Sequence, residues 1–198
     1  MTPAITYMGP QIAHASIELD AATLEGCRAG DPEALRCFVV RYERTVFALL
    51  SRMLGSGPHV EDLAQETFLR AFRALPRFDA TGPARPSTWL LTIATRLVQD
   101  ERRKRRPSLQ RLEADLPAAA PGTPETERSR AELGRAISRA AGELSDEHRD
   151  VFVLAEFHGL DMKEIAQVLS IPEGTVKTRL LRARERLRAL LQSVWEDT

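Results

Sequence analysis

The segment MKEIAQVLSIPEGTVKTRLLRARERL, residues 162–187, carries the pattern that decides the fold. Asp161 with Glu164 forms a capping-box pattern, which predicts a short helix over residues 162–169. The tight connection Ser170-Ile171-Pro172 follows, and then a longer helical stretch whose inward stripe is Val176, Leu180, Ala183 and Leu187. A short helix, a three-residue turn and a longer helix with a basic outer face together predict a helix-turn-helix.

The outer face of the longer helix has side chains suited to nucleic acid. At 100° per residue, this face is expected to hold Thr175, Thr178, Arg179, Arg182 and Arg186, with Lys177 and Arg184 at its flank. Arginine can pair with guanine through two hydrogen bonds, and threonine can contact a thymine methyl group. An arginine-rich solvated helix would explain the charge alone, but the short helix and turn before it favour DNA binding.

The net charge of the 198-residue chain is zero, yet the charges are unevenly distributed. Residues 96–111 include seven basic and two acidic side chains, and residues 177–188 include six basic and one acidic. Residues 113–127 carry four acidic side chains and no basic one. Because binding depends on local patches, the two basic segments predict two separate contacts with one polyanion.

The remaining periodicity is helical, so the sequence predicts an all-α fold without strands. Asp31-Pro32-Glu33 is a strong helix start, with a capping side chain, a proline and an acid. That helix should stop near Gly55, and further helices are expected over about 60–75 and from a cap at Ser87 or Thr88 to residue 106. Beyond these, helices are expected over about 127–143, from a cap at Ser145 to Gly159, and over about 173–191.

The composition divides the chain into two small helical domains joined by a flexible linker. Residues 107–126 include DLPAAAPGTPET, which is typical of an interdomain linker. The predicted domains are residues 21–106 and 127–198, the second containing the helix-turn-helix. Residues 1–20 show no clear periodicity and are predicted to be a disordered extension, without the features of a secretion signal.

The helix over about 60–75 has a second face, opposite its apolar stripe, that includes Asp62, Gln65, Glu66, Leu69 and Arg73. A leucine among exposed polar groups suits a protein–protein contact. An ordinary solvated face with one exposed leucine explains the pattern equally well.

The helix over 87–106 is expected to present Thr92, Arg96, Gln99 and Arg103 outward. Its end carries six consecutive charged residues, 101–106, which would attract phosphates without sequence preference. Complementing the helix dipole is the alternative role, although it needs fewer charges. Trp89 could support unstacked bases, but a core role is favoured.

Three segments in order resemble the extracytoplasmic-function (group IV) sigma factors of the sigma-70 superfamily. EDLAQETFLRAFRALPRFD (61–79) is similar to the second region of that family, and STWLLTIATRLVQDERRKRR (87–106) to its promoter-melting helix. LSDEHRDVFVLAEFHGLDMKEIAQVLSIPEGTVKTRLLRARERLRALL (144–191) is similar to its fourth region. The resemblance covers about 170 residues of the chain, with the linker in the expected place.

The resemblance implies a promoter-reading subunit of RNA polymerase, not an enzyme, with no cofactor and no metal. Core-polymerase contacts would come from Asp62, Gln65, Glu66 and Leu69, which would dock on the coiled coil of the largest subunit. Contacts to the −10 element and its melting would come from Trp89, Thr92, Arg96, Gln99, Arg102 and Arg103. Contacts to the −35 element would come from Thr175, Lys177, Thr178, Arg179, Arg182 and Arg186.

Further expectations also follow from the resemblance. The second domain would contact the polymerase flap, an anti-sigma factor would be a partner, and the protein would be cytoplasmic without membrane insertion. The family often has asparagine where this chain has Arg96, so its −10 preference does not carry over.

Two other functions are open on the residues alone. One is a conventional helix-turn-helix regulator that does not engage polymerase, although the N-terminal half shows no strands for a receiver domain. The other is a metal-dependent nuclease using Glu61, Asp62 and Glu66. Cys27 and Cys37 are expected to be free thiols, and the four histidines show no ligand spacing.

Overall fold

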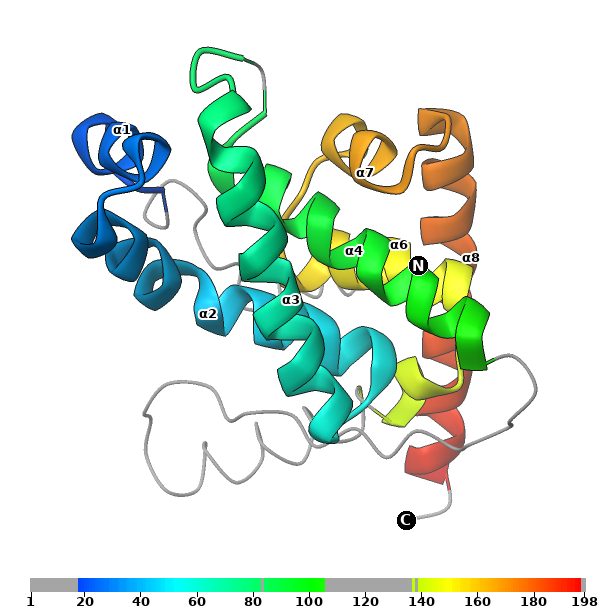
Figure 1. Ribbon diagram of the computed structural model, residues 1–198. Helices are drawn as coiled ribbons and strands as arrows, with labels where there is room; N and C mark the ends of the chain where they lie inside the picture. The colour runs from blue at the N-terminus through cyan, green and yellow to red at the C-terminus, as the bar shows by residue number, and fades with distance from the viewer. Residues whose placement is uncertain (1–17, 83, 106–136, 138, 197–198) are drawn as a thin grey trace, which may run out of the picture.

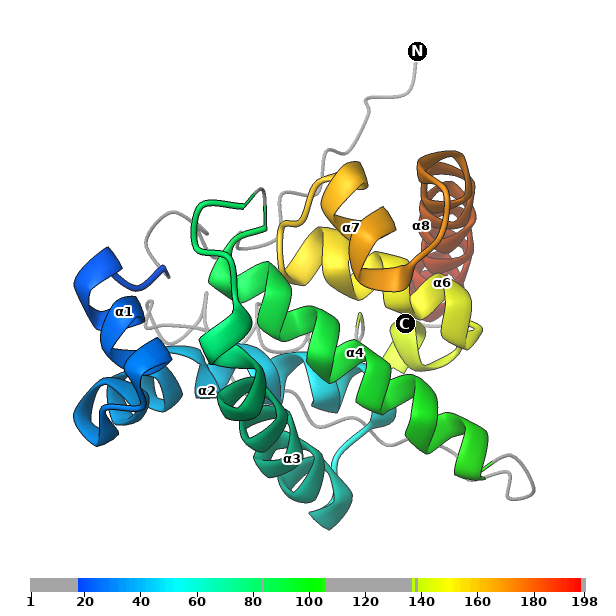
Figure 2. The ribbon, with the colours of Figure 1, turned by 45° about the horizontal axis from the view of Figure 1, so that its top comes forward.

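The structure is a computed structural model that describes residues 18–82, 84–105, 137 and 139–196. Every regular element in these ranges is helical, which confirms the all-α prediction. In chain order the elements are α1 (Ala21–Ala29), α2 (Pro32–Leu54), α3 (Pro58–Ala74), the 3₁₀ helix η2 (Leu75–Arg77), α4 (Pro86–Arg105), α6 (Asp146–Phe152), the π-helix η3 (Val153–Phe157), α7 (Met162–Leu169) and α8 (Glu173–Glu196). Figures 1 and 2 show α4 between α3 and the C-terminal helices.

The two helices with strong capping signals, α2 and α7, begin where the sequence predicts. The Asp31 side chain accepts from the backbone N–H of Glu33, and Pro32 opens α2. The capping box before α7 is complete, because Asp161 accepts from Glu164 N at 2.8 Å and Glu164 accepts from Asp161 N at 3.0 Å. These bonds satisfy backbone donors that a helix leaves unpaired at its first turn.

Other helix ends differ from the expected ones. α3 begins at Pro58, and α4 begins at Pro86, so Ser87 and Thr88 lie in its first turn and do not cap it. Proline takes the first helical position readily, because its fixed φ suits the helix and its missing N–H is not needed there. Ser145 precedes α6 but makes no capping bond, since its hydroxyl lies 2.9 Å from Nδ1 of His148.

Two predicted segments fall mainly outside the described residues. The linker over 107–126 is one, and most of the helix expected over 127–143 is the other, of which residues 139–142 are described and helical. At the C-terminal end, α8 extends to Glu196, beyond the expected end at residue 191, and no glycine or proline follows Gly174 to stop it.

The N-terminal unit is built on α2, whose inward face packs against α3 and α4. Its buried side chains include Leu49, Leu50 and Met53, and the Phe38 ring meets Tyr42 edge-on at 4.8 Å. Cys27 is buried and Cys37 exposed, and both are free thiols as expected. Burial raises the pKa of the Cys27 thiol, which keeps it protonated and unreactive.

Glu18 joins three parts of this unit. Its carboxylate accepts from the Tyr42 hydroxyl at 3.0 Å and from both the hydroxyl and the N–H of Ser87 at the start of α4. Burial and the Glu18 charge raise the pKa of Tyr42, so its hydroxyl keeps the proton it donates. Residues 18–20, placed in the N-terminal extension from the sequence, are therefore described and bonded to the core, whereas residues 1–17 lie outside the described part.

The C-terminal unit contains the predicted helix-turn-helix. α7 ends at Ser170, which adopts the left-handed conformation at φ 55° and ψ 45° and turns the chain toward α8. The Ile171 N–H donates back to the Ala166 carbonyl at 3.1 Å and closes the turn. The predicted inward stripe of α8 is confirmed, because its four apolar side chains are buried: Val176, Leu180, Ala183 and Leu187.

The two units lie against each other. α4 packs on α7, and the end of α2 contacts α6 and η3. Buried apolar side chains of both units form one continuous cluster, from Leu24 in α1 to Leu187 in α8. α4 therefore has neighbours on both sides, as Figure 2 shows.

The capping box generates a stability prediction. Asp161→Ala should lower the free energy of unfolding by about 1 kcal/mol, because the Glu164 N–H loses its acceptor. Asp161→Asn keeps an acceptor oxygen and should stay close to the unchanged protein. Urea denaturation followed by circular dichroism measures both, and an Ala variant as stable as the Asn variant would contradict the capping role.

Candidate nucleic-acid interface

The outward face of α8 is exposed and basic. Lys177, Thr178, Arg182 and Arg186 are all exposed, as predicted, and no described helix covers them. The Thr178 hydroxyl donates to the Gly174 carbonyl at 2.9 Å, so its methyl group is the part presented outward. This surface offers guanidinium and ammonium donors at the start and middle of a helix held by a helix-turn-helix.

Arg179 is turned further inward than the sequence analysis expected, because its position three residues after Val176 places it only about 60° from the inward stripe. Its guanidinium bonds the carboxylate of Glu147 in α6 at 2.8 Å, and only 25% of its side chain is exposed. Thr175 is also only partly exposed. Arg179 lies on the side of α8 that faces α6, which is why it is less open than Arg182.

Leu181 is a residue of this face that the sequence analysis did not single out. It is 57% exposed, among the most exposed large apolar side chains described. Its position five residues after Val176 places it well away from the inward stripe, so the same helical arithmetic could have identified it. An apolar side chain among basic ones adds a group that can contact a thymine methyl.

The candidate residues of α4 occupy different environments. Arg96 is exposed, and Arg103 is exposed and bonds Asp100 at 2.5 Å, one turn back on the same helix. Thr92 is half-buried, and its hydroxyl donates to the Thr88 carbonyl at 2.9 Å. Arg96 and Arg103 therefore remain open to solvent, while Thr92 is open in part.

Arg102 is bound within the protein. Its Nη1 donates to both carboxylate oxygens of Asp150 at 2.8 Å, and its Nη2 donates to the Met53 carbonyl at 2.8 Å. Its side chain is 14% exposed, and that of Asp150 is 8% exposed. A guanidinium with these partners cannot also reach a DNA phosphate, so in this arrangement Arg102 joins the two units.

Trp89 packs against Phe78, with ring centroids 4.8 Å apart and planes tilted by 43°. The side chain is half-buried in the apolar core at the start of α4. This contact supports the core role favoured from the sequence and leaves part of the ring accessible.

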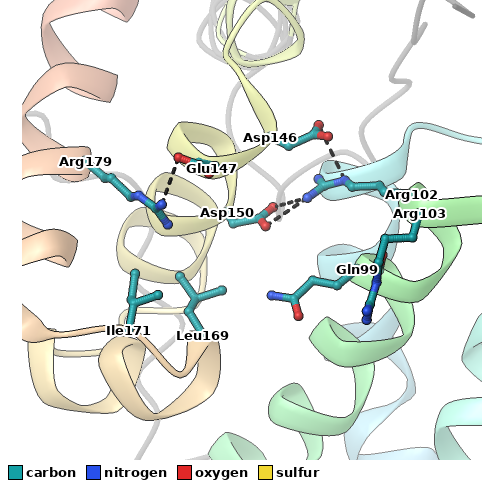
Figure 3. A pocket seen from close by; sticks show the side chains of 9 residues that line it. All are labelled: Gln99, Arg102, Arg103, Asp146, Glu147, Asp150, Leu169, Ile171 and Arg179. Carbon is teal, nitrogen blue, oxygen red and sulfur yellow. Dashed lines mark hydrogen bonds and ion pairs between the residues drawn. The ribbon is translucent and has the colours of Figure 1, made fainter. Parts of the chain in front are cut away.

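A cavity of about 370 Å³ lies between the two units, where α4 faces α7 and α8. In Figure 3, Gln99 of α4 points toward Leu169 and Ile171 across it. Arg103 and Arg179 also line it, so residues predicted for the −10 and −35 elements meet in one place. Its walls also carry the carboxylates of Asp146, Glu147 and Asp150, whose negative charges oppose the binding of an anion such as a DNA phosphate in the cavity.

The outward face of α3 is arranged as the sequence predicts. Asp62, Gln65 and Leu69 are exposed, Leu69 by 48%, and Glu66 is half-buried and bonds Arg70 at 2.7 Å. These positions follow the i, i+3, i+4, i+7 spacing of one helix face, opposite the buried side chains of α3. The surface is therefore an exposed leucine surrounded by acids and an amide.

The described residues contain neither a cluster of metal ligands nor a helix that could span a membrane. In that part of the chain, no three side chains of His, Cys, Asp or Glu are grouped so that they could hold a metal ion. None of its helices has the length and apolar character that crossing a membrane requires.

Two family models match the chain. Sigma-70 region 2 matches residues 38–107, which include most of α2, all of α3 and α4. Sigma-70 region 4 matches residues 134–187, which include the helix-turn-helix. The order and separation of the two matches agree with the two helical units of the structure.

Curated relatives match along most of their length. The chain is 36% identical to the ECF RNA polymerase sigma factor SigW of Bacillus subtilis, over 84% of this chain and 94% of SigW. It is 34% identical to the ECF RNA polymerase sigma-E factor of Escherichia coli K12, over 84% and 91%. It is 31% identical to the RNA polymerase sigma-H factor of Pseudomonas aeruginosa, over 91% and 97%.

Two solved structures share the fold. CnrH in complex with the cytosolic domain of CnrY superposes with a TM-score of 0.62 at 28% identity, covering 87% of this chain and 96% of that one. The sigma factor RpoE of Bartonella quintana, in complex with the anti-sigma factor NepR, superposes with a TM-score of 0.65 at 22% identity, covering 79% and 96%.

Matches of this identity and coverage, on a fold with the helix-turn-helix and the outward faces described above, establish the family. The chain belongs to the sigma-70 family, among its extracytoplasmic-function sigma factors.

Proposed function

We propose that α8 reads the −35 element of a promoter as duplex DNA. The observation that carries this is the exposed face of Lys177, Thr178 and Arg182 on the second helix of a helix-turn-helix. A helix of this kind enters the major groove, where arginine discriminates bases and lysine binds phosphate. Leu181 lies on the same outward side and can contact thymine methyl groups.

The −10 contacts are proposed to come from α4. Arg96 and Arg103 are exposed along one side of it, while Gln99 between them and Thr92 one turn before Arg96 are partly exposed. Basic side chains along a helix bind a single strand through its phosphates, and a partly open aromatic such as Trp89 can stack on a base. Arg102 could join these contacts only after leaving Asp150.

The face of α3 is proposed to bind core RNA polymerase, specifically the coiled coil of the largest subunit. Leu69 supports this, because a leucine exposed by 48% and surrounded by polar groups matches the apolar centre and polar rim of a protein interface. Asp62, Gln65 and Glu66 would form the polar rim, and the second unit would reach the polymerase flap.

We also propose that an anti-sigma factor regulates this chain, and that it belongs to group IV. The two family matches and the similarity to ECF sigma factors support the group assignment. The two structural relatives, each solved with a protein bound, support the anti-sigma partner. Such a protein would act on the chromosome in the cytoplasm without chemistry, cofactor or metal of its own.

The −35 proposal is tested with Arg182→Ala. If Arg182 meets a base edge, the loss should weaken promoter binding by the polymerase holoenzyme by about 1–3 kcal/mol and relax sequence preference at that base. Arg44→Ala removes an exposed arginine of α2, on the other unit, and is the matched control. Transcription from promoter variants reports both effects, and an unchanged base preference would contradict the assignment.

The polymerase proposal is tested with Leu69→Ser. Replacing an apolar anchor at an interface centre should cost about 1–2 kcal/mol, equivalent to a roughly 5- to 30-fold weaker affinity for core polymerase. Val40→Ser is the control, because Val40 is also apolar, 65% exposed and outside this face. Equal affinities for the two variants would remove α3 as the docking surface.

A further inference from the structure

The contact between the two units is centred on a group of charged residues, here called the interdomain ion cluster. It consists of Arg102 from α4, and Asp146, Arg149 and Asp150 from α6, around the Met53 carbonyl at the end of α2. Arg102 and Arg149 both donate to that carbonyl, at 2.8 Å and 3.3 Å. Asp146 accepts from Arg149 at 3.4 Å and forms an ion pair with Arg102, also at 3.4 Å.

Each member of the cluster has a defined anchor. Arg149 is 4% exposed and also donates to the carbonyls of Ala141, Gly142 and Leu144, which fixes it in the C-terminal unit. Asp150 has Arg102 as its two-bond partner, and both are largely buried. Buried pairs of this kind have strict geometry, because an unpaired buried charge is costly.

A second anchor lies at the other end of α4. Glu164 of α7 accepts from the Thr88 hydroxyl at 3.2 Å and lies 3.9 Å from Arg85. Thr88 and Arg102 are 14 residues apart, a separation of about 21 Å along a helix. Two anchors this far apart fix the orientation of α4 against the C-terminal unit.

A third contact joins α2 to η3. The Arg52 guanidinium lies 4.3 Å from the centre of the Phe157 ring, in a cation–π arrangement. Burial lowers the pKa of Arg52 to about 10, so the side chain stays charged at neutral pH. The docked surface therefore combines ion pairs, hydrogen bonds and an aromatic contact along α2 and α4 of the N-terminal unit.

The contact between the two units involves residues that are proposed to bind promoter DNA. Arg102 is bound to Asp150, while Gln99 and Arg103 line the cavity that Leu169 and Arg179 close from the other side (Figure 3). The outward faces of α4 and α8 remain exposed, but two DNA readers held together across one cavity cannot both reach promoter elements that lie apart along the duplex. Opening the units would return Arg102 and Asp150 to water, so it costs far less than leaving either charge buried alone.

We propose that the surface formed by α4 and the end of α2 has the chain's own C-terminal unit as its partner. The docked arrangement is a closed state, held by the interdomain ion cluster, that must open before both DNA sites can act. The claim that docking hinders DNA binding rests on the proposed function, whereas the claim that the two units dock does not. If the open state is 1–10% of molecules, closure weakens DNA binding about 10- to 100-fold.

Asp146→Arg tests the closed state. Asp146 is half exposed, so an arginine there can be accommodated, and it would repel Arg102 and Arg149 across the contact. Glu143→Arg is the matched control, because it makes the same charge change at an exposed residue outside the cluster. Circular dichroism should show equal helix content in the three full-length proteins.

Small-angle X-ray scattering is the first measurement. A compact chain of this length has a radius of gyration of roughly 16 Å, to which residues outside the packed helices add. The unchanged protein and Glu143→Arg should give the same radius, and Asp146→Arg a larger one by several ångströms. An unchanged protein as expanded as Asp146→Arg would overturn the proposal, and this comparison holds even if the variant loses helix content.

Binding to a short mixed-sequence DNA duplex at low salt is the second measurement. Asp146→Arg should bind at least 10-fold more tightly than Glu143→Arg, which carries the same net charge. Equal affinities of the two variants for this DNA would overturn the claim that docking hinders DNA binding. An expanded Asp146→Arg with no DNA binding by any of the proteins would support docking and contradict the proposed DNA-binding function instead.

Discussion

The ion pair between Arg102 and Asp150 is the constraint on which the arrangement of the two units depends. Both side chains are largely buried, and a buried carboxylate without a partner costs several kcal/mol. The docked C-terminal unit must therefore bring Asp150 to α4 in one orientation. That orientation places α7 along α4, and Arg179, held by Glu147 of its own unit, lines the shared cavity.

α4 is central because one of its sides packs into the core while another contacts the C-terminal unit. One side packs into the core with α2 and α3, where Leu90, Leu91 and Val98 are buried. Another carries polar and basic side chains that suit a promoter strand and also contact the C-terminal unit. The same chemistry that binds phosphate, an arginine with free donors, also binds Asp150. The carboxylate of Asp150 and a DNA phosphate would therefore compete for Arg102. The outward face of α3 lies outside this contact and stays exposed.

Sequence patterns were sufficient where structure is set locally. The capping box at Asp161 and Glu164 and the stripe from Val176 to Leu187 depend on neighbours a few residues away, and both are confirmed. The contact between Arg102 and Asp150 spans 48 residues and leaves no periodic trace, so it could not be predicted. The inward turn of Arg179 was missed for a different reason, because the helical period places it only about 60° from Val176 and this was not taken into account. The starts of α3 and α4 were misplaced because the proline preference for the first helical turn was given too little weight.

The central claim is that this chain directs core RNA polymerase to promoters. The most direct test is transcription in vitro from genomic DNA by core polymerase, with and without the purified full-length protein, followed by mapping of the RNA 5′ ends. The account predicts new start sites that appear only with the protein and share two spaced upstream elements. A protein that neither associates with core polymerase nor adds any start site would contradict it.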